Sequence, residues 1–388
     1  MKRDIIYIVI IVLLATALGI LLFAKMENKQ PPEEQSSGIV QDSGVVAYDA
    51  DEEVYEWDIE VVATGLDVPW DLAFLPDNRL LITERSGQLK VLQNGAVSTI
   101  AVLHNVASVG ESGFTGLAVH PQFEENNFIY LYYTYRDAGQ IFNRVSRFEL
   151  KEEKLMNEIY ILNNLPGGSI HNGGRMKFGR DEMLWVLTGD AARPALAQDA
   201  KSLAGKVLRI KDDGSVPDDN PTLGSLVYSL GHRNPQGLDW HPLTEELIVL
   251  SHGETAHDEV NLVVPKGNYG WPVEKKCKEK PPFIAPILCS GQHTWAPSGG
   301  VFLGTDPWRL RYSFFFAGLR GNLLKRIEII DSVVAKEEDV ILGGYGRLRA
   351  VVVGPDGSLY VSTSNKDGRG DPAKEDDRIL KVTPRLVR

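Results

Sequence analysis

The stretch LAFLPDNRLLITERSGQLKVL, Leu72–Leu92, decides the fold. Aliphatic and β-branched residues flank a Pro-Asp-Asn turn, a pattern that predicts a strand, a tight turn and a second strand. The same pattern returns near the end of the chain in AVVVGPDGSLYVSTSNKDG, Ala350–Gly368. A unit that recurs along a chain indicates a repeat architecture.

Three further stretches have this pattern: Leu117–Tyr135, Met176–Asp190 and Leu238–Gly253. A sixth unit fits between Ser298 and Ile329, where the gap between successive turns is twice the usual length. Units spaced roughly 45 to 60 residues apart are typical of propeller blades. Helical periodicity is not convincing anywhere in the globular part, so the sequence predicts an all-β fold, a six-bladed β-propeller.

Two strands at the ends of the globular region are expected to close the ring. WDIEVVATGL, Trp57–Leu66, precedes the first unit and is predicted to pair with the last blade near Ile379–Thr383. A closed ring leaves a central channel, and loops from all six blades converge at its mouth. Residues far apart in the sequence can therefore form one site there.

The N-terminal segment is predicted to lie outside this fold. Ile5–Ala24 has twenty residues without a charge, enough for a helix to cross a membrane. Residues 1–26 are therefore interpreted as a membrane anchor, a transmembrane or signal-anchor helix, with a cleavable signal peptide as the alternative. Lys2 and Arg3 favour a cytoplasmic N-terminus. The propeller is then expected outside the cytoplasm, at the cell surface or in a periplasm, or secreted if the segment is cleaved.

Composition constrains the rest of the chain. Residues 27–56 are rich in Gln, Glu, Pro and Ser and are interpreted as a flexible linker, which leaves residues 57–388 for the propeller. The net charge of −11 argues against nucleic-acid binding. Cys277 and Cys289 are the only cysteines. In a Pro-rich loop outside the cytoplasm, they are predicted to form a disulfide.

A histidine motif, HNGGRMKFG, His171–Gly179, opens the third unit. Glycines let a backbone approach a ligand closely, and a loop histidine is the usual proton acceptor in catalysis. Asp190, in the following loop, is positioned to orient the imidazole ring. The alternative is that His171 only hydrogen-bonds its own loop.

Arginines stand at the start of two other units. Arg233 and Asn234 open the fourth, whereas Arg347 and Arg349 open the sixth. Side chains two apart on a strand point the same way, so Arg347 and Arg349 can face one ligand. Clustered arginines repel one another, which suggests a polycarboxylate or phosphate ligand; the alternative is a solvated strand face.

An acidic pair, Asp258 and Glu259, follows a glycine-containing turn in the fourth unit. Carboxylates together with exposed loop carbonyls suit calcium. The alternative is a solvated acidic turn.

Taken together, the motifs from Val68–Arg85 through His171–Gly179 to Arg347–Gly370 resemble the PQQ-dependent sugar dehydrogenases, six-bladed propellers that include soluble glucose and aldose dehydrogenases. The resemblance covers about Trp57–Pro384, with the motifs in the same order. It implies a quinoprotein dehydrogenase that oxidises the C1 hydroxyl of an aldose to a lactone by hydride transfer to pyrroloquinoline quinone (PQQ). It also implies calcium as a second cofactor and an external or membrane-associated electron acceptor.

The resemblance gives individual residues their expected roles. His171 matches the catalytic base, and Asp190 matches the carboxylate that orients it. Cofactor contacts map to Arg233, Asn234, Arg347 and Arg349. Calcium ligands map to the carbonyls of Gly253 and Glu254 in the active site and, for a structural ion, to Glu259 and the carbonyl of Tyr269.

Two positions near the expected cofactor and sugar depart from the family pattern. Glu111 stands where a glutamine is usual, and Arg320 stands where a lysine contacts the cofactor. These changes leave the sugar undetermined. Two other functions stay open: a non-catalytic extracellular propeller binding module, and a calcium-dependent lactonase-type hydrolase.

Overall fold

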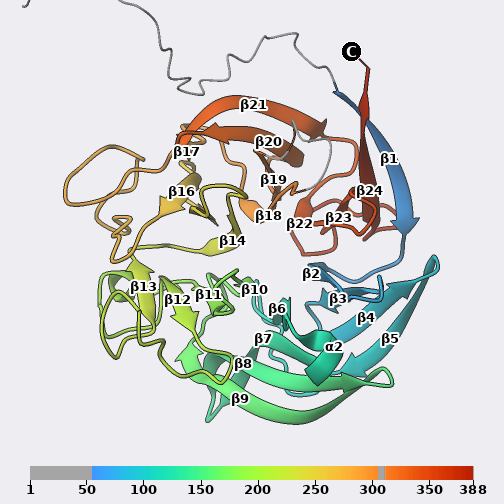
Figure 1. The fold of residues 1–388 in the computed structure, drawn as a ribbon, viewed down its shortest axis with the longest axis horizontal. Helices are drawn as coiled ribbons and strands as arrows, with labels where there is room; N and C mark the ends of the chain where they lie inside the picture. The colour runs from blue at the N-terminus through green and yellow to red at the C-terminus, as the bar shows by residue number, and fades with distance from the viewer. Residues whose placement is uncertain (1–54, 305–309, 311, 388) are drawn as a thin grey trace, which may run out of the picture. The chain divides into compact units, whose positions relative to one another are not determined.

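The computed structural model describes residues 55–304, 310 and 312–387. These residues form six four-stranded antiparallel sheets, arranged as blades around a common centre (Figure 1). The all-β, six-bladed propeller predicted from the sequence is therefore confirmed. Each Pro- or Gly-containing turn of the repeat joins the first two strands of a blade.

The strands of the first five blades follow one another outward from the centre in chain order, whereas the last blade has the N-terminal strand β1 on its outside. The first blade comprises β2 (Pro69–Phe74), β3 (Leu80–Glu84), β4 (Gln88–Gln93) and β5 (Ala96–Val102). The second comprises β6 (Phe114–Val119), β7 (Phe128–Asp137), β8 (Gln140–Lys151) and β9 (Lys154–Pro166). The third comprises β10 (Met176–Phe178), β11 (Leu184–Thr188), β12 (Lys206–Ile210) and β13 (Val227–Leu230). The fourth blade comprises β14 (Pro235–Trp240), β15 (Leu247–Ser251), β16 (Glu259–Val263) and β17 (Leu288–Cys289). The fifth comprises β18 (Pro297–Phe302), β19 (Ser313–Gly318), β20 (Leu323–Ile330) and β21 (Val333–Leu342). The sixth comprises β22 (Leu348–Val353), β23 (Leu359–Thr363), β24 (Ile379–Leu386) and β1 (Tyr55–Ala63).

Strand β1 closes the ring as the outer strand of the last blade. It pairs antiparallel with β24, from Tyr55 opposite Leu386 to Ala63 opposite Ile379. The pairing predicted from the sequence is confirmed, and it joins the N-terminal strand of the propeller to its C-terminal strand. The other edge of β24 pairs with β23, so strands from both ends of the propeller complete the last blade.

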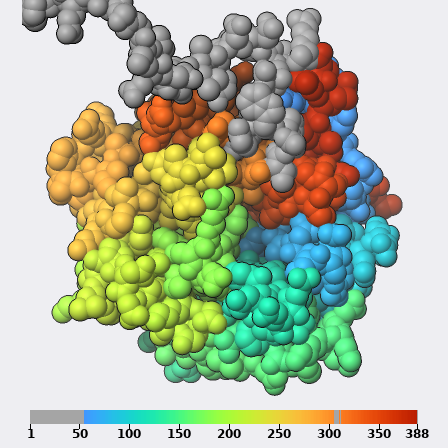
Figure 2. All heavy atoms as spheres, in the orientation of Figure 1, coloured from blue at the N-terminus to red at the C-terminus, as the bar shows by residue number. Residues whose placement is uncertain are grey.

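The alternation of side chains along each strand builds the core. In β19, Phe315 and Ala317 pack in the cluster shared with the sixth blade, whereas Phe314 and Phe316 pack in the cluster shared with the fourth. Six such hydrophobic clusters occur in the described chain, one between each pair of neighbouring blades. Figure 2 shows the blades in side-by-side contact around the ring. The inner strands are thereby fixed, and so are the loops that precede them.

Helices contribute little to the described residues. They form a short α-helix, α2 (Phe123–Asn126), and a 3-10 helix, η1 (Pro194–Ala197). None of the described helices has the length and hydropathy to span a membrane. The predicted anchor, residues 1–26, and residues 27–54 of the predicted linker, residues 27–56, lie outside the described residues, so both stay predictions. The last two residues of that linker, Tyr55 and Glu56, belong to β1.

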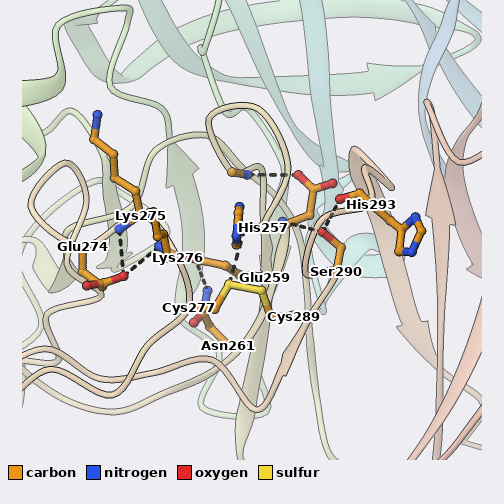
Figure 3. The surroundings of a disulfide bond; sticks show 12 residues. His257, Glu259, Asn261, Glu274, Lys275, Lys276, Cys277, Cys289, Ser290 and His293 are labelled. Atoms are coloured by element: carbon orange, nitrogen blue, oxygen red, sulfur yellow. Dashed lines mark hydrogen bonds between the residues drawn. A yellow bond between two sulfur atoms is a disulfide. The ribbon is translucent and has the colours of Figure 1, made fainter.

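The predicted disulfide is present between Cys277 and Cys289 (Figure 3). It ties the long connection after β16 to strand β17. Within this connection the Glu274 carboxylate accepts the backbone N–H groups of Lys275 and Lys276. The disulfide thus holds a lysine-rich loop against the fourth blade.

Candidate active site

The loop that enters the third blade holds His171 in an unusual backbone conformation. Its φ of 58° lies in the left-handed region, where non-glycine residues are uncommon and are often functional. The carbonyl of His171 accepts the N–H of Ala191 at 2.9 Å, and its own N–H donates to Glu111 Oε2 at 3.2 Å. A Cβ on Gly173 would lie 2.5 Å from the carbonyl oxygen of Leu187, so this loop position requires glycine.

His171 and Asp190 form a hydrogen-bonded pair. The distance from His171 Nδ1 to Asp190 Oδ1 is 2.8 Å, and the Asp190 side chain is fully buried. Asp190 Oδ1 also accepts the N–H of Ala192, and Oδ2 accepts Trp271 Nε1, both at 2.8 Å. A carboxylate held on both oxygens fixes the imidazole with Nδ1–H directed at it, which leaves Nε2 free to accept a proton.

A cavity of about 560 Å³ lies beside this pair, where the inner strands begin and the loops enter the blades. Eight of the thirteen candidate site residues named from the sequence line it: Glu111, His171, Arg233, Gly253, Glu254, Asp258, Arg320 and Arg347. Asp190 lies directly behind His171. The ring therefore brings residues from five different blades or their entry loops into one site.

The arginines of the last blade differ from the sequence-based expectation. Arg347 and Arg349 both bind one carboxylate oxygen of Asp367, at 2.8–3.1 Å. Burial alone would raise the pKa of Asp367, but these two guanidinium groups lower it below the usual value. Contrary to what the sequence suggested, the two arginines therefore do not require a ligand anion, because the protein supplies the Asp367 carboxylate. Of the two, only Arg347 lines the cavity.

Arg233 and Asn234 have donors that are not satisfied. Arg233 Nε and Asn234 Nδ2 are buried without a hydrogen-bond partner in the described chain. Asn234 Oδ1 accepts the N–H of Gly173, which places Asn234 directly under the histidine loop. Buried polar groups are normally paired, so the unpaired donor of Arg233, which lines the cavity, suits a ligand with acceptor oxygens.

Glu111 sits between the histidine loop and the last blade. One carboxylate oxygen accepts His171 N–H, and the other pairs with Arg369 at 2.7 Å. Burial opposes ionisation of Glu111, but Arg369 and the neighbouring imidazoles hold its pKa below the usual range. Arg320, whose backbone N–H donates to Trp295, presents an exposed side chain at the cavity. Both departures from the family pattern therefore face the site.

The loop between β15 and β16 supplies two lining residues of the cavity. Gly253 and Glu254 line it, and neither carbonyl accepts a hydrogen bond from the described residues. Asp258 organises this loop, because its carboxylate accepts the N–H groups of Gly253, Trp295 and Ala296 at 2.7–3.0 Å. With its carboxylate so engaged, Asp258 is a poorer ligand than the sequence suggested.

Glu259 and Tyr269 lie outside the cavity. The Glu259 carboxylate accepts Asn261 Nδ2 at 3.0 Å, as Figure 3 shows, while the Tyr269 ring stacks on His232. Although the residue is only partly buried, the carboxyl group is enclosed, and this burial raises the pKa of Glu259 to about 7. No hydrogen bond or ion pair joins these two residues in the described structure.

Three residues of the site escaped the sequence analysis: Asp367, Trp271 and Arg369. Asp367 and Arg369 belong to the loop that follows the RLRAV strand pair, and Trp271 belongs to the NYGWP turn. Each reaches its partner through an arrangement of blades or loops that local spacing does not show. A sequence signal existed only for Trp271, as an aromatic residue in a glycine turn.

Fold and site together define a propeller enzyme with an imidazole–carboxylate pair and an arginine-lined cavity at the channel mouth. Comparison with known proteins identifies its family. Residues 66–380 match the family model described as Glucose / Sorbosone dehydrogenase, so the chain belongs to that family. The assignment to the sugar dehydrogenases made from the sequence is confirmed.

Individual relatives agree with this membership. The PQQ-bound form of an aldose sugar dehydrogenase from Streptomyces coelicolor is 36% identical with a TM-score of 0.78, covering 85% of this chain and 99% of that one. An aldose sugar dehydrogenase of Escherichia coli is 30% identical over 353 residues, 84% of this chain and 93% of that protein. A Thermus oxidoreductase, provisionally described as a glucose dehydrogenase, is 43% identical with a TM-score of 0.78, covering 84% of this chain and all of that one.

Proposed function

We propose that this protein is a PQQ-dependent dehydrogenase that oxidises the C1 hydroxyl of an aldose to a lactone. The observation that carries the proposal is one cavity that contains both the His171 imidazole, oriented by Asp190, and the unpaired Nε donor of Arg233 at its wall. The relatives support it, since one is described as PQQ-bound and two as aldose sugar dehydrogenases.

The residues present fit a cofactor with several carboxylates. Arg233, Arg320, Arg347 and Arg369 all line the cavity, and guanidinium groups bind carboxylates in two-point fashion. Asp367 holds Arg347 from behind, so that this arginine is oriented before a ligand arrives. A wall with four arginine side chains, against the three carboxylates of Glu111, Glu254 and Asp258, suits an anionic cofactor better than it suits the acid-lined metal centre of a lactonase-type hydrolase.

The protein's own part in the reaction is to bind, orient and accept a proton. His171 Nε2 takes the proton of the C1 hydroxyl, and Asp190 stabilises the imidazolium that results. A bound quinone would supply the hydride acceptor for C1, and a bound cation would supply Lewis-acid polarisation. Glu111, ionised beside His171, accepts hydrogen bonds from other sugar hydroxyl groups.

We also propose calcium at this site, held by the carbonyls of Gly253 and Glu254. Both residues line the cavity and both carbonyls lack donors in the described chain, which suits a cation that prefers oxygen ligands. A second ion at Glu259 and the carbonyl of Tyr269 would stabilise the enclosed carboxylate, whose neighbours Asp258 and Glu274 add negative charge.

The cellular setting is a further part of the proposal. The apolar segment Ile5–Ala24 would hold residues 57–388 outside the cytoplasm, where electrons would pass to a membrane-associated acceptor. The Cys277–Cys289 disulfide supports this location, because structural disulfides persist in oxidising compartments.

Reconstitution tests the proposed function. The purified propeller, given PQQ and calcium, should show a quinone absorbance change on binding and reduce a dye when aldoses are added. The chelated protein, with PQQ but no calcium, is the control and should lose turnover. Binding without turnover on any aldose would favour the binding module, and no binding would contradict the proposal.

A further inference from the structure

The carboxylate of Asp190 is fixed by a residue from a different blade. Asp190 precedes η1 in the third blade, whereas Trp271 follows β16 in the fourth. The indole Nε1 donates to Asp190 Oδ2 at 2.8 Å, while the other oxygen serves His171. This tryptophan therefore controls the rotation of the carboxylate that orients the base.

The tryptophan itself has little freedom. Its backbone N–H donates to the carbonyl of Gly231 at 3.0 Å, and its carbonyl accepts Gln198 Nε2 at 2.7 Å. The side chain is 7% exposed. With both backbone groups anchored, the indole N–H is directed at Asp190 by the surrounding structure.

The ring of the same tryptophan contacts the cationic wall of the cavity. The Arg233 guanidinium lies 5.3 Å from the ring centroid, and the Lys275 ammonium, paired with Glu254, lies 5.0 Å from it. Cations at this range are attracted by the ring quadrupole. Arg233 is also tied to Asp190 through its carbonyl, which accepts Asp190 N–H at 2.8 Å.

We propose that Trp271 is a positioning residue that links the proton-accepting side of the site to its anion-binding side. Its N–H holds Asp190 so that His171 keeps Nδ1–H toward the carboxylate and Nε2 free. Its ring holds the Arg233 guanidinium beside the cavity. The inference rests on the proposed function, and it assigns the two contacts to separable parts of one side chain.

Two substitutions separate these contacts. W271F removes the N–H and keeps an aromatic face, so kcat should fall about tenfold while KM and PQQ affinity stay within about twofold. W271L removes both, so PQQ affinity, measured by titration calorimetry, should fall several-fold as well. A spectroscopic readout needs no cofactor: in the apo protein with 15N-labelled histidine, the His171 side chain should change from a single Nδ1–H tautomer to a mixture in W271F.

The chain offers a closely matched control in Trp185. Its Nε1 also donates to an aspartate, Asp181 at 3.3 Å, and its ring also faces an arginine, Arg209 at 5.8 Å, on the flank of the third blade. W185F should change none of the three readouts. Thermal melts identify any variant that misfolds. If W271L does not fold, the kcat of W271F and its histidine spectrum still test the inference.

Unchanged kcat and an unchanged His171 tautomer in W271F would overturn the inference. An equal drop in both variants with no extra loss of PQQ affinity in W271L would overturn the role of the ring. If the wild-type protein binds no PQQ, the proposed function fails, but the histidine spectrum still tests the link from Trp271 to Asp190.

Discussion

The two ends of the central channel handle buried charge in opposite ways. Toward the ends of the inner strands, a cavity of about 620 Å³ is lined by apolar side chains and by the buried ion pair of Asp71 with Arg175. Asp71 also accepts the N–H groups of Leu72 and Leu117, and Arg175 Nε donates to the carbonyl of Gln236. Every charge there is paired, and the pair ties together the inner strands of several blades.

The mouth, where the inner strands begin, leaves donors unpaired. Arg233 Nε and Asn234 Nδ2 have no partner in the described structure, and His171 adopts a left-handed backbone conformation beside them. The mouth cavity is the smaller of the two. The two ends of the channel therefore differ in whether their buried polar groups have hydrogen-bond partners, and cavity size does not distinguish the structural end from the functional end.

The largest expected effect concerns the structural end. Arg175→Met should lower the free energy of unfolding by about 3–5 kcal/mol, because it leaves the buried Asp71 without its counter-ion. Denaturant unfolding measures the loss. Arg180→Met is the control, since its pair with Glu245 is exposed and should change stability by less than about 1 kcal/mol. Equal losses in the two variants would remove the distinction between the buried and the surface pair.

The counterpart at the mouth is Arg233→Met. Arg233 forms no ion pair with a carboxylate of the described chain, so this substitution should change the free energy of unfolding by less than about 1 kcal/mol. It should weaken PQQ binding about 100-fold, because charge-assisted hydrogen bonds to the ligand are lost. Calorimetric titration measures the affinity. Arg193→Met, an exposed arginine outside the cavity, should bind as wild type. A large stability loss with unchanged affinity would reverse the comparison.

His232 shows that a buried nitrogen without a hydrogen-bond partner can also lie outside the functional site. His232 Nδ1 also lacks a partner, but burial, followed by the charge of Lys206, lowers the pKa of His232 to about 3. The folded state then binds fewer protons than the unfolded one, so this stability is present above about pH 6.5 and is lost as the pH falls toward 3. Compared with His232→Phe, the wild type should lose about 2 kcal/mol more between pH 7 and pH 4.5 in unfolding titrations. Parallel pH curves would show that the buried imidazole titrates normally.

The smallest effect is expected for Glu111→Gln. The substitution keeps an acceptor for His171 N–H but removes the partly exposed ion pair with Arg369, so stability should change by about 0.5 kcal/mol or less. The KM for the best aldose should change by a few-fold, because the hydroxyl acceptor at the cavity loses its charge. Arg369→Gln is the matched control for the ion pair. Equal KM shifts in both would assign the effect to the ion pair instead of the carboxylate.

The sequence predicted the features that depend on local pattern. Strand alternation and turn spacing identified six blades, and the pairing of β1 with β24 followed from strands left over at the two ends. The histidine motif and the entry arginines could be recognised because each precedes an inner strand. Asp367 could not, and Trp271 stood out only as an aromatic residue in a glycine turn, since their roles depend on which loops and blades become neighbours once the ring closes.

The measurement that tests the account most directly is single-turnover reduction of bound PQQ by an aldose in His171→Ala and in the wild type. Both proteins should bind PQQ with the same affinity, because Arg233 and Arg347 are untouched. Reduction should be slower in the variant by about 100-fold or more, the usual contribution of a general base. Equal rates of reduction in the two proteins would contradict the assignment of His171 as the base at the channel mouth.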